Sequence, residues 1–235
     1  MTAAAAVASR PATIEVLRFA LDVPAERLAE LRALLSADER QRAARLRFAR
    51  DADRFVAGRG LLRTALAERV AQRPQDLRFA YGPAGKPSLA DHPGVRFNAA
   101  GAAGAALVAI AEDLEVGIDL EHVEPEADDL AVARQFFTAG EVAELEGLDP
   151  GERQGAFLRA WTRKEAYVKA LGAGLQVDLD RFAVSLLPGE PAQLRWTQRP
   201  GEAERWTLVD LSDPARGSVA ALCHEAAEVV VEDRA

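Results

Sequence analysis

The chain has 235 residues, 49% of them apolar, with a formal net charge of −8 and a single cysteine. This length and apolar content can bury a sizeable core, which excludes global disorder and leaves room for one large domain or two small ones. The negative net charge argues against non-specific electrostatic binding to nucleic acid or to an anionic membrane. One cysteine excludes an internal disulfide framework, and with three scattered histidines it forms no recognisable zinc site.

Nothing in the sequence indicates export or insertion into a membrane. Residues 1–12 are rich in alanine but lack a basic start followed by a long apolar run, and no segment approaches the length of a membrane span. We therefore expect a cytoplasmic protein that binds no nucleic acid and no membrane. Any phosphate that it binds is expected to belong to a small molecule.

The first half predicts a strand, several helices and then short strands. Apolar and β-branched residues mark the strands, and Ser36 with Glu39 has the spacing of a helix N-cap. In chain order we predict a strand at 13–23, helices from Pro24 and from Ser36, a helix at 51–71 that ends before Pro74, and strands at 77–81, 95–98, 105–111 and 116–121.

The second half repeats this order, with helices followed by strands. We predict helices at 130–137, 139–146 and 152–171, and strands at 182–187, 192–197, 206–211, 218–223 and 227–232. Helices followed by strands, twice, favour an α+β fold over a doubly wound parallel sheet. We expect an N-terminal lobe at 1–114 and a C-terminal lobe at 115–235, with a ligand site between them.

The segment 116–121 (VGIDLE) reads as a strand of period two with both carboxylates on one face. Asp119 and Glu121 would repel each other unless something neutralises them, and a hard divalent cation does so with oxygen ligands. A solvated edge strand explains this pair equally well. Gly117 lies on the same face and would allow another backbone or a ligand to come close.

Lysine is rare in this chain, which holds only Lys86, Lys164 and Lys169 among its 29 basic residues. The lysine side chain ends in a compact ammonium that suits a single phosphate oxygen, whereas arginine ends in a planar guanidinium. Any one of these lysines could be a solvent-exposed residue without a function. Because all three stand in a chain that otherwise uses arginine, we treat them together as candidate functional residues.

In the predicted helix at 152–171, Glu165 shares a face with Trp161 and with Lys169. An ordinary salt bridge explains Glu165 and Lys169. Glu165 could instead complete a cation site with Asp119 and Glu121 while Lys169 meets a phosphate, and magnesium suits such a set because it takes a few carboxylates together with substrate phosphate.

The segment 117–121 (GIDLE), followed some forty residues later by 161–175 (WTRKEAYVKALGAGL), resembles the signature pair of the surfactin-type 4'-phosphopantetheinyl transferases. Weaker matches extend the resemblance over most of the chain, at 54–63, 85–87, 97–98 and 136–138 with Glu141. The resemblance implies two α+β lobes related by pseudo-twofold symmetry, with the active site in the cleft between them. It also implies a monomer rather than a trimer.

The resemblance implies that Asp119, Glu121 and Glu165 bind Mg²⁺ together with the pyrophosphate of coenzyme A. Lys169 would contact that phosphate, and Lys86 would contact the coenzyme's phosphate end. The reaction would move phosphopantetheine from coenzyme A to a serine of an acyl or peptidyl carrier protein and release adenosine 3',5'-bisphosphate.

The same resemblance gives further roles to residues around this centre. Arg54 and Arg42 would help to hold the adenosine 3'-phosphate side of the coenzyme. Glu165 is the candidate base for the carrier serine hydroxyl, directly or through water. Lys164 would assist the leaving phosphate or orient the helix.

The chain departs from the family pattern after Asn98, where the family usually carries Ser-His-Ser or Ser-His-Thr and this chain has Ala100-Gly101-Ala102. No side chain of the run 99–106 forms hydrogen bonds, so we expect weaker binding of coenzyme A with the magnesium site retained. The alternative is a non-catalytic homologue that binds coenzyme A or a carrier protein. A third interpretation is a different magnesium-dependent enzyme that acts on phosphates. It requires the motifs at 117–121 and 161–175 to match the family by coincidence.

Overall fold

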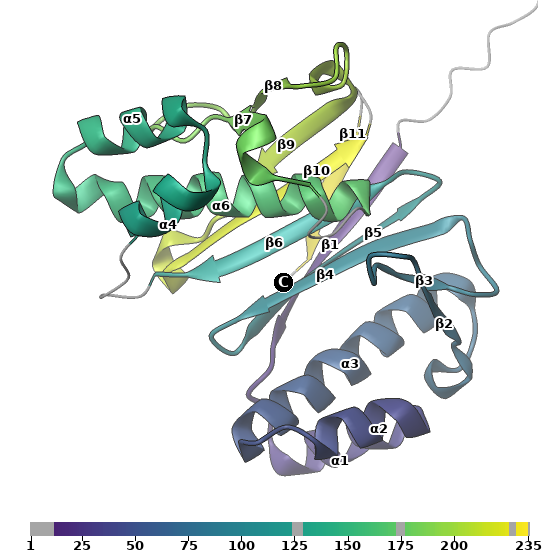
Figure 1. Ribbon diagram of the computed structural model, residues 1–235. Coiled ribbons are helices and arrows are strands. Elements are labelled where there is room, and N and C mark those ends of the chain that lie inside the picture. Colours follow the sequence, from purple (N-terminus) through teal and green to yellow (C-terminus); the bar gives the residue numbers. More distant parts are fainter. Residues whose placement is uncertain (1–11, 124–128, 173–176, 226–228, 235) are drawn as a thin grey trace, which may run out of the picture.

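The computed structural model describes residues 12–123, 129–172, 177–225 and 229–234, which form two similar α+β halves (Figure 1). In each half, one helix of 22 residues packs on a mainly antiparallel sheet. None of the helices in these ranges is both long enough and apolar enough to cross a membrane.

The first half holds three helices and five strands: β1 (Ala12–Ala20), α1 (Ala25–Ala33), α2 (Ala37–Ala44), α3 (Ala49–Val70), β2 (Phe79–Tyr81), β3 (Pro87–Leu89), β4 (Val95–Ala102) and β5 (Ala105–Glu112). The sequence did not predict β3, and β4 runs four residues further than predicted. Its extra residues belong to the run 99–106, which forms a β-hairpin whose turn residues, Ala103 and Gly104, have φ of 47° and 86°. Positive φ at both turn positions matches the twist of the flanking strands.

The second half follows the predicted order: β6 (Val116–His122), α4 (Asp129–Phe136), α5 (Ala139–Gly147), α6 (Pro150–Leu171), β7 (Phe182–Val184), β8 (Leu194–Thr197), β9 (Trp206–Asp210), β10 (Ser218–Glu225) and β11 (Val229–Arg234). Strand β7 is three residues shorter than predicted.

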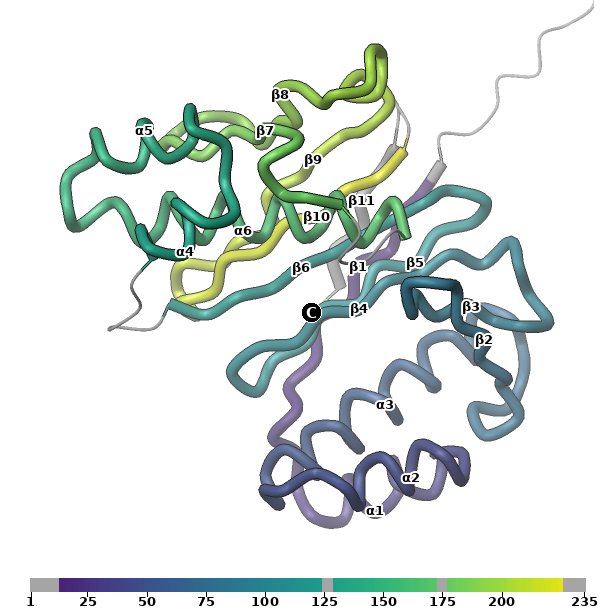
Figure 2. Tube along the Cα trace, in the orientation of Figure 1, coloured from purple at the N-terminus to yellow at the C-terminus, as the bar shows by residue number. Residues whose placement is uncertain are grey.

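The last strand returns to the first half. The larger sheet has the order β11-β1-β5-β4, in which β1, β5 and β4 can be followed in Figure 2. Strand β11 runs parallel to β1, with Val229 opposite Ala12. The other sheet of more than two strands has the order β6-β10-β9 and is antiparallel. A strand from the predicted C-terminal lobe therefore completes the sheet of the first half, and the division at residue 114 stays a prediction.

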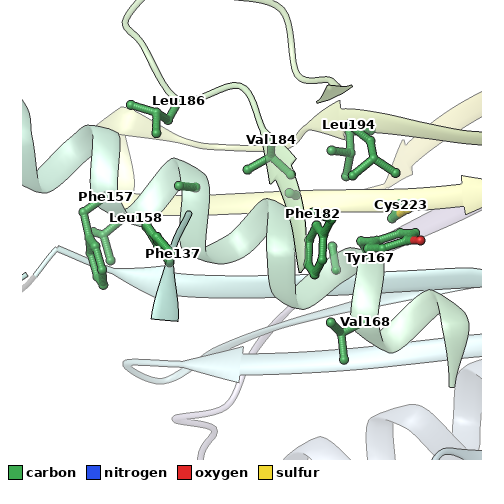
Figure 3. Packing of buried hydrophobic residues seen from close by; sticks show 14 of the residues in the cluster. Phe137, Phe157, Leu158, Tyr167, Val168, Phe182, Val184, Leu186, Leu194 and Cys223 are labelled. Atoms are coloured by element: carbon green, nitrogen blue, oxygen red, sulfur yellow. The ribbon is translucent and has the colours of Figure 1, made fainter. Parts of the chain in front are cut away.

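Four apolar clusters hold these elements together, the smallest of them joining α1, α2 and α3 around Leu35, Ala43 and Val56. The first lies between the two sheets and takes Ile14 and Val16 from β1 and Ile118 from β6. The second lies beneath α3, and the third lies beneath α6, where aromatic and aliphatic side chains pack between the helix, β7 and β10 (Figure 3).

Each half also buries a charged pair in the same place. Helix α2 begins with a capping box in which Glu39 accepts a hydrogen bond from the backbone N–H of Ser36, and Glu39 also accepts one from Arg63 of α3 at 2.7 Å. Helix α5 begins with the equivalent box, in which Glu141 accepts from the N–H of Thr138. Its buried cation comes from α6.

That cation is Lys164, which lies as far along α6 as Arg63 lies along α3. Its ammonium is fully buried and lies 2.9 Å from a carboxylate oxygen of Glu141, and it donates to the carbonyls of Leu179 and Phe182 at 2.8 and 2.7 Å. Glu141 also accepts from the N–H of Val184 at 2.9 Å. The pair therefore ties together the start of α5, strand β7 and the middle of α6.

The closest contact between β6 and α6 is at Gly117. A Cβ atom built there would lie 2.1 Å from the carbonyl oxygen of Ala166 and 2.2 Å from the backbone nitrogen of Ala170. Both are backbone atoms, so the helix could accept a side chain at residue 117 only by moving away from the strand.

We expect Glu141→Ala to lower the free energy of unfolding by about 3–5 kcal/mol, because it leaves the Lys164 ammonium buried without its partner. Denaturant unfolding followed by circular dichroism measures this loss. Glu146→Ala is the matched control, because Glu146 forms an exposed pair with Arg134 and should change the stability by less than about 1 kcal/mol. Equal losses in the two variants would contradict the structural role of Glu141.

We expect Gly117→Ala to lower the free energy of unfolding by about 1–3 kcal/mol, because the added methyl group forces α6 away from β6. Thermal and denaturant unfolding measure the effect. Gly151→Ala, in the first turn of the same helix, is the control, because a Cβ there would have no neighbour within 4 Å among the residues that the structure describes. A Gly117→Ala protein as stable as this control would show that the helix moves at no cost.

Candidate active site

The two carboxylates of β6 face helix α6, as the period-two pattern predicts. Val116, Ile118 and Leu120 point into the apolar layer between the sheets. The alternate residues lie under the helix, where Gly117 allows the close approach and Asp119 reaches Lys169.

Asp119 is buried, and only one of its two carboxylate oxygens has a hydrogen-bond partner among the described residues. The ammonium of Lys169 lies 2.5 Å from its Oδ1, whereas its buried Oδ2 has no hydrogen-bond partner among the described residues. Burial raises the pKa of the Asp119 carboxyl, although the Lys169 charge acts in the opposite direction. A buried carboxylate oxygen without a partner is costly, so this position favours a further positive group.

Glu121 and Glu165 share this environment. Burial raises the pKa of Glu121, and repulsion from Asp119 raises it further, while a hydrogen bond from Trp161 lowers it. Burial also raises the pKa of Glu165, with Lys169 lowering it and Asp119 raising it. The structure thus brings the three predicted carboxylates and Lys169 into one electrostatically coupled group between β6 and α6.

The donor set of this group fits a hard divalent cation. It offers carboxylate oxygens, one of them buried and without a partner in the described part of the chain, and a negative charge that Lys169 offsets only in part. The side chains are not gathered around a common point: residues 12–123, 129–172, 177–225 and 229–234 contain no cluster of three or more His, Cys, Asp or Glu that could hold a metal ion. In this arrangement Lys169 supplies the positive charge at Asp119.

The other two lysines lie outside the carboxylate group. Lys164 faces α5 and β7 and has no exposed surface, so of its two predicted roles its contacts agree with orienting the helix. Lys86 lies where the two halves meet, and its Nζ donates to Glu115 and to the carbonyls of Val116 and Ala170.

The two predicted arginines lie on the helices of the first half. Arg54, on α3, forms a bidentate ion pair with Asp22. It also lies against the β4–β5 turn, where a Cβ atom on Gly104 would be 2.6 Å from its guanidinium. Arg42, on α2, stacks over the ring of Phe55 at 5.2 Å. Arg54 thus borders the run 99–106, and Arg42 lies on the neighbouring helix.

The tip of the β4–β5 hairpin and the end of β6 enclose a cavity of about 290 Å³. Residues 102–107 form one wall, and Glu121 and His122 lie on another. The side chains of Ala100 and Ala102 pack against the apolar layer between the sheets. The segment that lacks hydrogen-bonding side chains therefore borders the same cavity as one of the predicted metal ligands.

One polar contact of this region was not predicted from the sequence. The side-chain oxygen of Asn98 accepts the backbone N–H of Ile118 at 2.8 Å, joining β4 to β6. This contact has no local signal in the sequence, because it joins residues 20 positions apart.

Comparison with known proteins matches both halves to one family. Residues 115–223 match the 4'-phosphopantetheinyl transferase superfamily, and residues 24–113 match the 4'-phosphopantetheinyl transferase N-terminal model. The chain is 37% identical over 201 residues to the 4'-phosphopantetheinyl transferase HetI of Nostoc sp., covering 84% of this chain and 82% of the relative.

Two Bacillus enzymes are also similar to this chain. The 4'-phosphopantetheinyl transferase psf-1 of Bacillus pumilus is 34% identical over 171 residues, covering 72% of each chain. The 4'-phosphopantetheinyl transferase Sfp of Bacillus subtilis is 30% identical over 154 residues, covering 66% of this chain and 67% of the relative. The chain therefore belongs to the 4'-phosphopantetheinyl transferase superfamily and is a 4'-phosphopantetheinyl transferase.

Proposed function

We propose that this enzyme transfers the 4'-phosphopantetheine moiety of coenzyme A to a serine of an acyl or peptidyl carrier protein at the carboxylate group between β6 and α6, with Mg²⁺ as cofactor. Asp119 carries this proposal. Its buried Oδ2 has no hydrogen-bond partner among the described residues, and its charge helps to raise the pKa values of Glu121 and Glu165, which supports a site built to receive positive charge.

Asp119, Glu121 and Glu165 would hold the cation through hard carboxylate oxygens. Bound there, Mg²⁺ would neutralise the negative charge on the coenzyme A pyrophosphate while the bond within that pyrophosphate breaks. The Oδ2 of Asp119 can meet the cation while Lys169 stays at Oδ1. The Lys169 side chain is 30% exposed, so its ammonium can also turn towards a phosphate of the coenzyme.

Glu165 is the proposed base for the carrier serine. Burial raises the pKa of its carboxyl, which brings it closer to the operating pH, where a general base works best. Its place on α6, one turn before Lys169, puts the base and the phosphate-binding cation on one face of the helix. Accepting the hydroxyl proton frees the serine oxygen to attack phosphorus.

The coenzyme contacts of the first half are further proposals. We propose that Arg54, which borders the hairpin, and Arg42 help to hold the adenosine 3'-phosphate side of the coenzyme; their contacts with the β4–β5 turn and with Phe55 are compatible with this role. Lys86 was predicted to meet the phosphate end, but its hydrogen bonds favour another role. Lys164 acts as a positioning residue, because its ammonium bonds to carbonyls and to Glu141. We expect the enzyme to act as a monomer.

Intact-mass spectrometry of an apo carrier protein, incubated with enzyme, coenzyme A and Mg²⁺, tests the reaction. We expect a gain of about 340 Da, one phosphopantetheine group. Glu165→Gln and Asp119→Asn should slow the gain by about a hundredfold or more, because each removes charge that acts in the transition state. A chelator should abolish the gain, and added Mg²⁺ should restore it.

Glu152→Gln is the matched control for this assay, because it changes an exposed glutamate in the first turn of the same helix. It should leave the rate unchanged. If Glu165→Gln transferred phosphopantetheine as fast as this control, Glu165 could be neither the base nor a required ligand.

A second test addresses the run 99–106. We expect the double change Ala100→Ser with Gly101→His to lower the KM for coenzyme A by about tenfold or more, because a charge-assisted hydrogen bond contributes about 1.5–3 kcal/mol. Gly101 is exposed, and a Cβ there would lie 3.3 Å from the carbonyl of Ala105, so a small shift accommodates the new side chain.

The change Ala99→Ser, at the exposed neighbouring position, is the control and should leave KM unchanged. Steady-state kinetics across a coenzyme titration measure both variants. An unchanged KM in the double variant would mean that this enzyme binds the coenzyme without needing side chains at these positions.

A further inference from the structure

Lys86 reaches across the two halves from the loop between β2 and β3. Its Nζ lies 2.8 Å from Glu115 Oε2, 3.1 Å from the carbonyl oxygen of Val116 and 3.0 Å from that of Ala170. An ammonium has three N–H donors, and here each has an acceptor. No donor of Lys86 is left for a phosphate unless one of these bonds is broken.

The two carbonyls belong to the two elements that carry the proposed active site. Val116 begins β6 three residues before Asp119, and Ala170 follows Lys169 near the end of α6. One side chain of the first half thus fixes the strand and the helix to each other close to the tight contact at Gly117.

The position of the ammonium suits the end of a helix. The last four carbonyls of a helix have no partner within it, and a cation there is favoured by the helix dipole. The carbonyl of Ala170 is one of these. Gly172 ends the helix with φ of 65°, and a Cβ there would lie 3.2 Å from Lys86 Cδ, so the lysine stem passes directly over the helix end.

We propose that Lys86 is a positioning residue, which holds β6 and α6 at the separation that the carboxylate group requires, rather than a ligand of the coenzyme phosphates. This inference rests on the proposed function of Asp119, Glu165 and Lys169. It explains why lysine stands here in a chain rich in arginine: the three donors of a compact ammonium point in three directions from one atom, whereas those of a guanidinium lie in one plane.

The two roles of Lys86 differ in measurable ways. A positioning residue acts on the chemical step, so Lys86→Met should lower kcat by about ten- to a hundredfold, the cost of a misplaced reacting group. The dissociation constant of adenosine 3',5'-bisphosphate, measured by calorimetry, should stay within about twofold, because no phosphate contact is lost. Lys86→Arg should not restore kcat.

Glu115→Gln tests the same contact while keeping the lysine. It removes the charged acceptor of the ammonium, so it should also lower kcat. A phosphate-binding Lys86 would instead be freed by this change and would bind adenosine 3',5'-bisphosphate more tightly. Glu115→Gln also keeps the test decisive if Lys86→Met fails to fold.

Arg96→Met is the matched control. Arg96 pairs with the same Glu115 at 3.2 Å but is 41% exposed, and its removal leaves the bonds from Lys86 to β6 and α6 in place. This variant should keep the kcat of the unchanged enzyme. Thermal unfolding of each variant confirms that it is folded at the assay temperature.

The positioning role is overturned if Lys86→Met weakens bisphosphate binding tenfold or more, if its kcat at saturating coenzyme A is unchanged, or if Lys86→Arg restores full activity. If the wild-type protein modifies no carrier protein, both the proposed function and this inference are refuted. If the wild-type protein is active and Lys86→Met has the same kcat, only the positioning role is refuted.

Discussion

The site depends on the contact between β6 and α6, where backbone meets backbone. At Gly117 the helix lies so close to the strand that a single methyl group would collide with the main chain of Ala166 and Ala170. This closeness leaves little room for water around Asp119 and Glu165, and the resulting burial raises their pKa values. The same contact that gives the second half its core therefore also creates an unbalanced negative charge.

Buried cations determine how the long helices sit on their sheets. Arg63 of α3 and Lys164 of α6 occupy equivalent positions, and each meets the glutamate of a capping box. Since the box glutamate also binds backbone N–H groups at the start of its own helix, one carboxylate connects two helices. Leaving either charge unpaired would be costly, so the helices have few alternative positions. Lys169 is the lysine with the largest exposed fraction and the one whose ammonium contacts a predicted metal ligand.

Much of the fold could be predicted because its signals are local. Alternation in 116–121 predicts the strand and the face of its carboxylates, and the spacing of Ser36 and Glu39 predicts the start of α2. Strand β3 was missed because its three residues begin with proline and carry no alternation. Its pairing with β2 depends on tertiary contacts.

The candidate site was likewise predictable only where its signals are local. The grouping of the carboxylates with Lys169 could be predicted because these residues lie in two compact motifs whose periodicities give their faces. The partners of Lys86 could not be found, because Ala170 is 84 residues away and backbone carbonyls have no sequence signature. For Lys164, the sequence showed a rare residue but gave no sign that the side chain turns inward.

The pairing of β11 with β1 has a consequence for how the chain folds as it is made. Strand β1 emerges from the ribosome first, but its neighbour on one side, residues 229–234, emerges only after both long helices. Until then β1 has β5 on one edge and an open edge on the other. The first half therefore cannot complete its sheet while the first 228 residues are being made, and reaches its final state only after residues 229–234 have been synthesised.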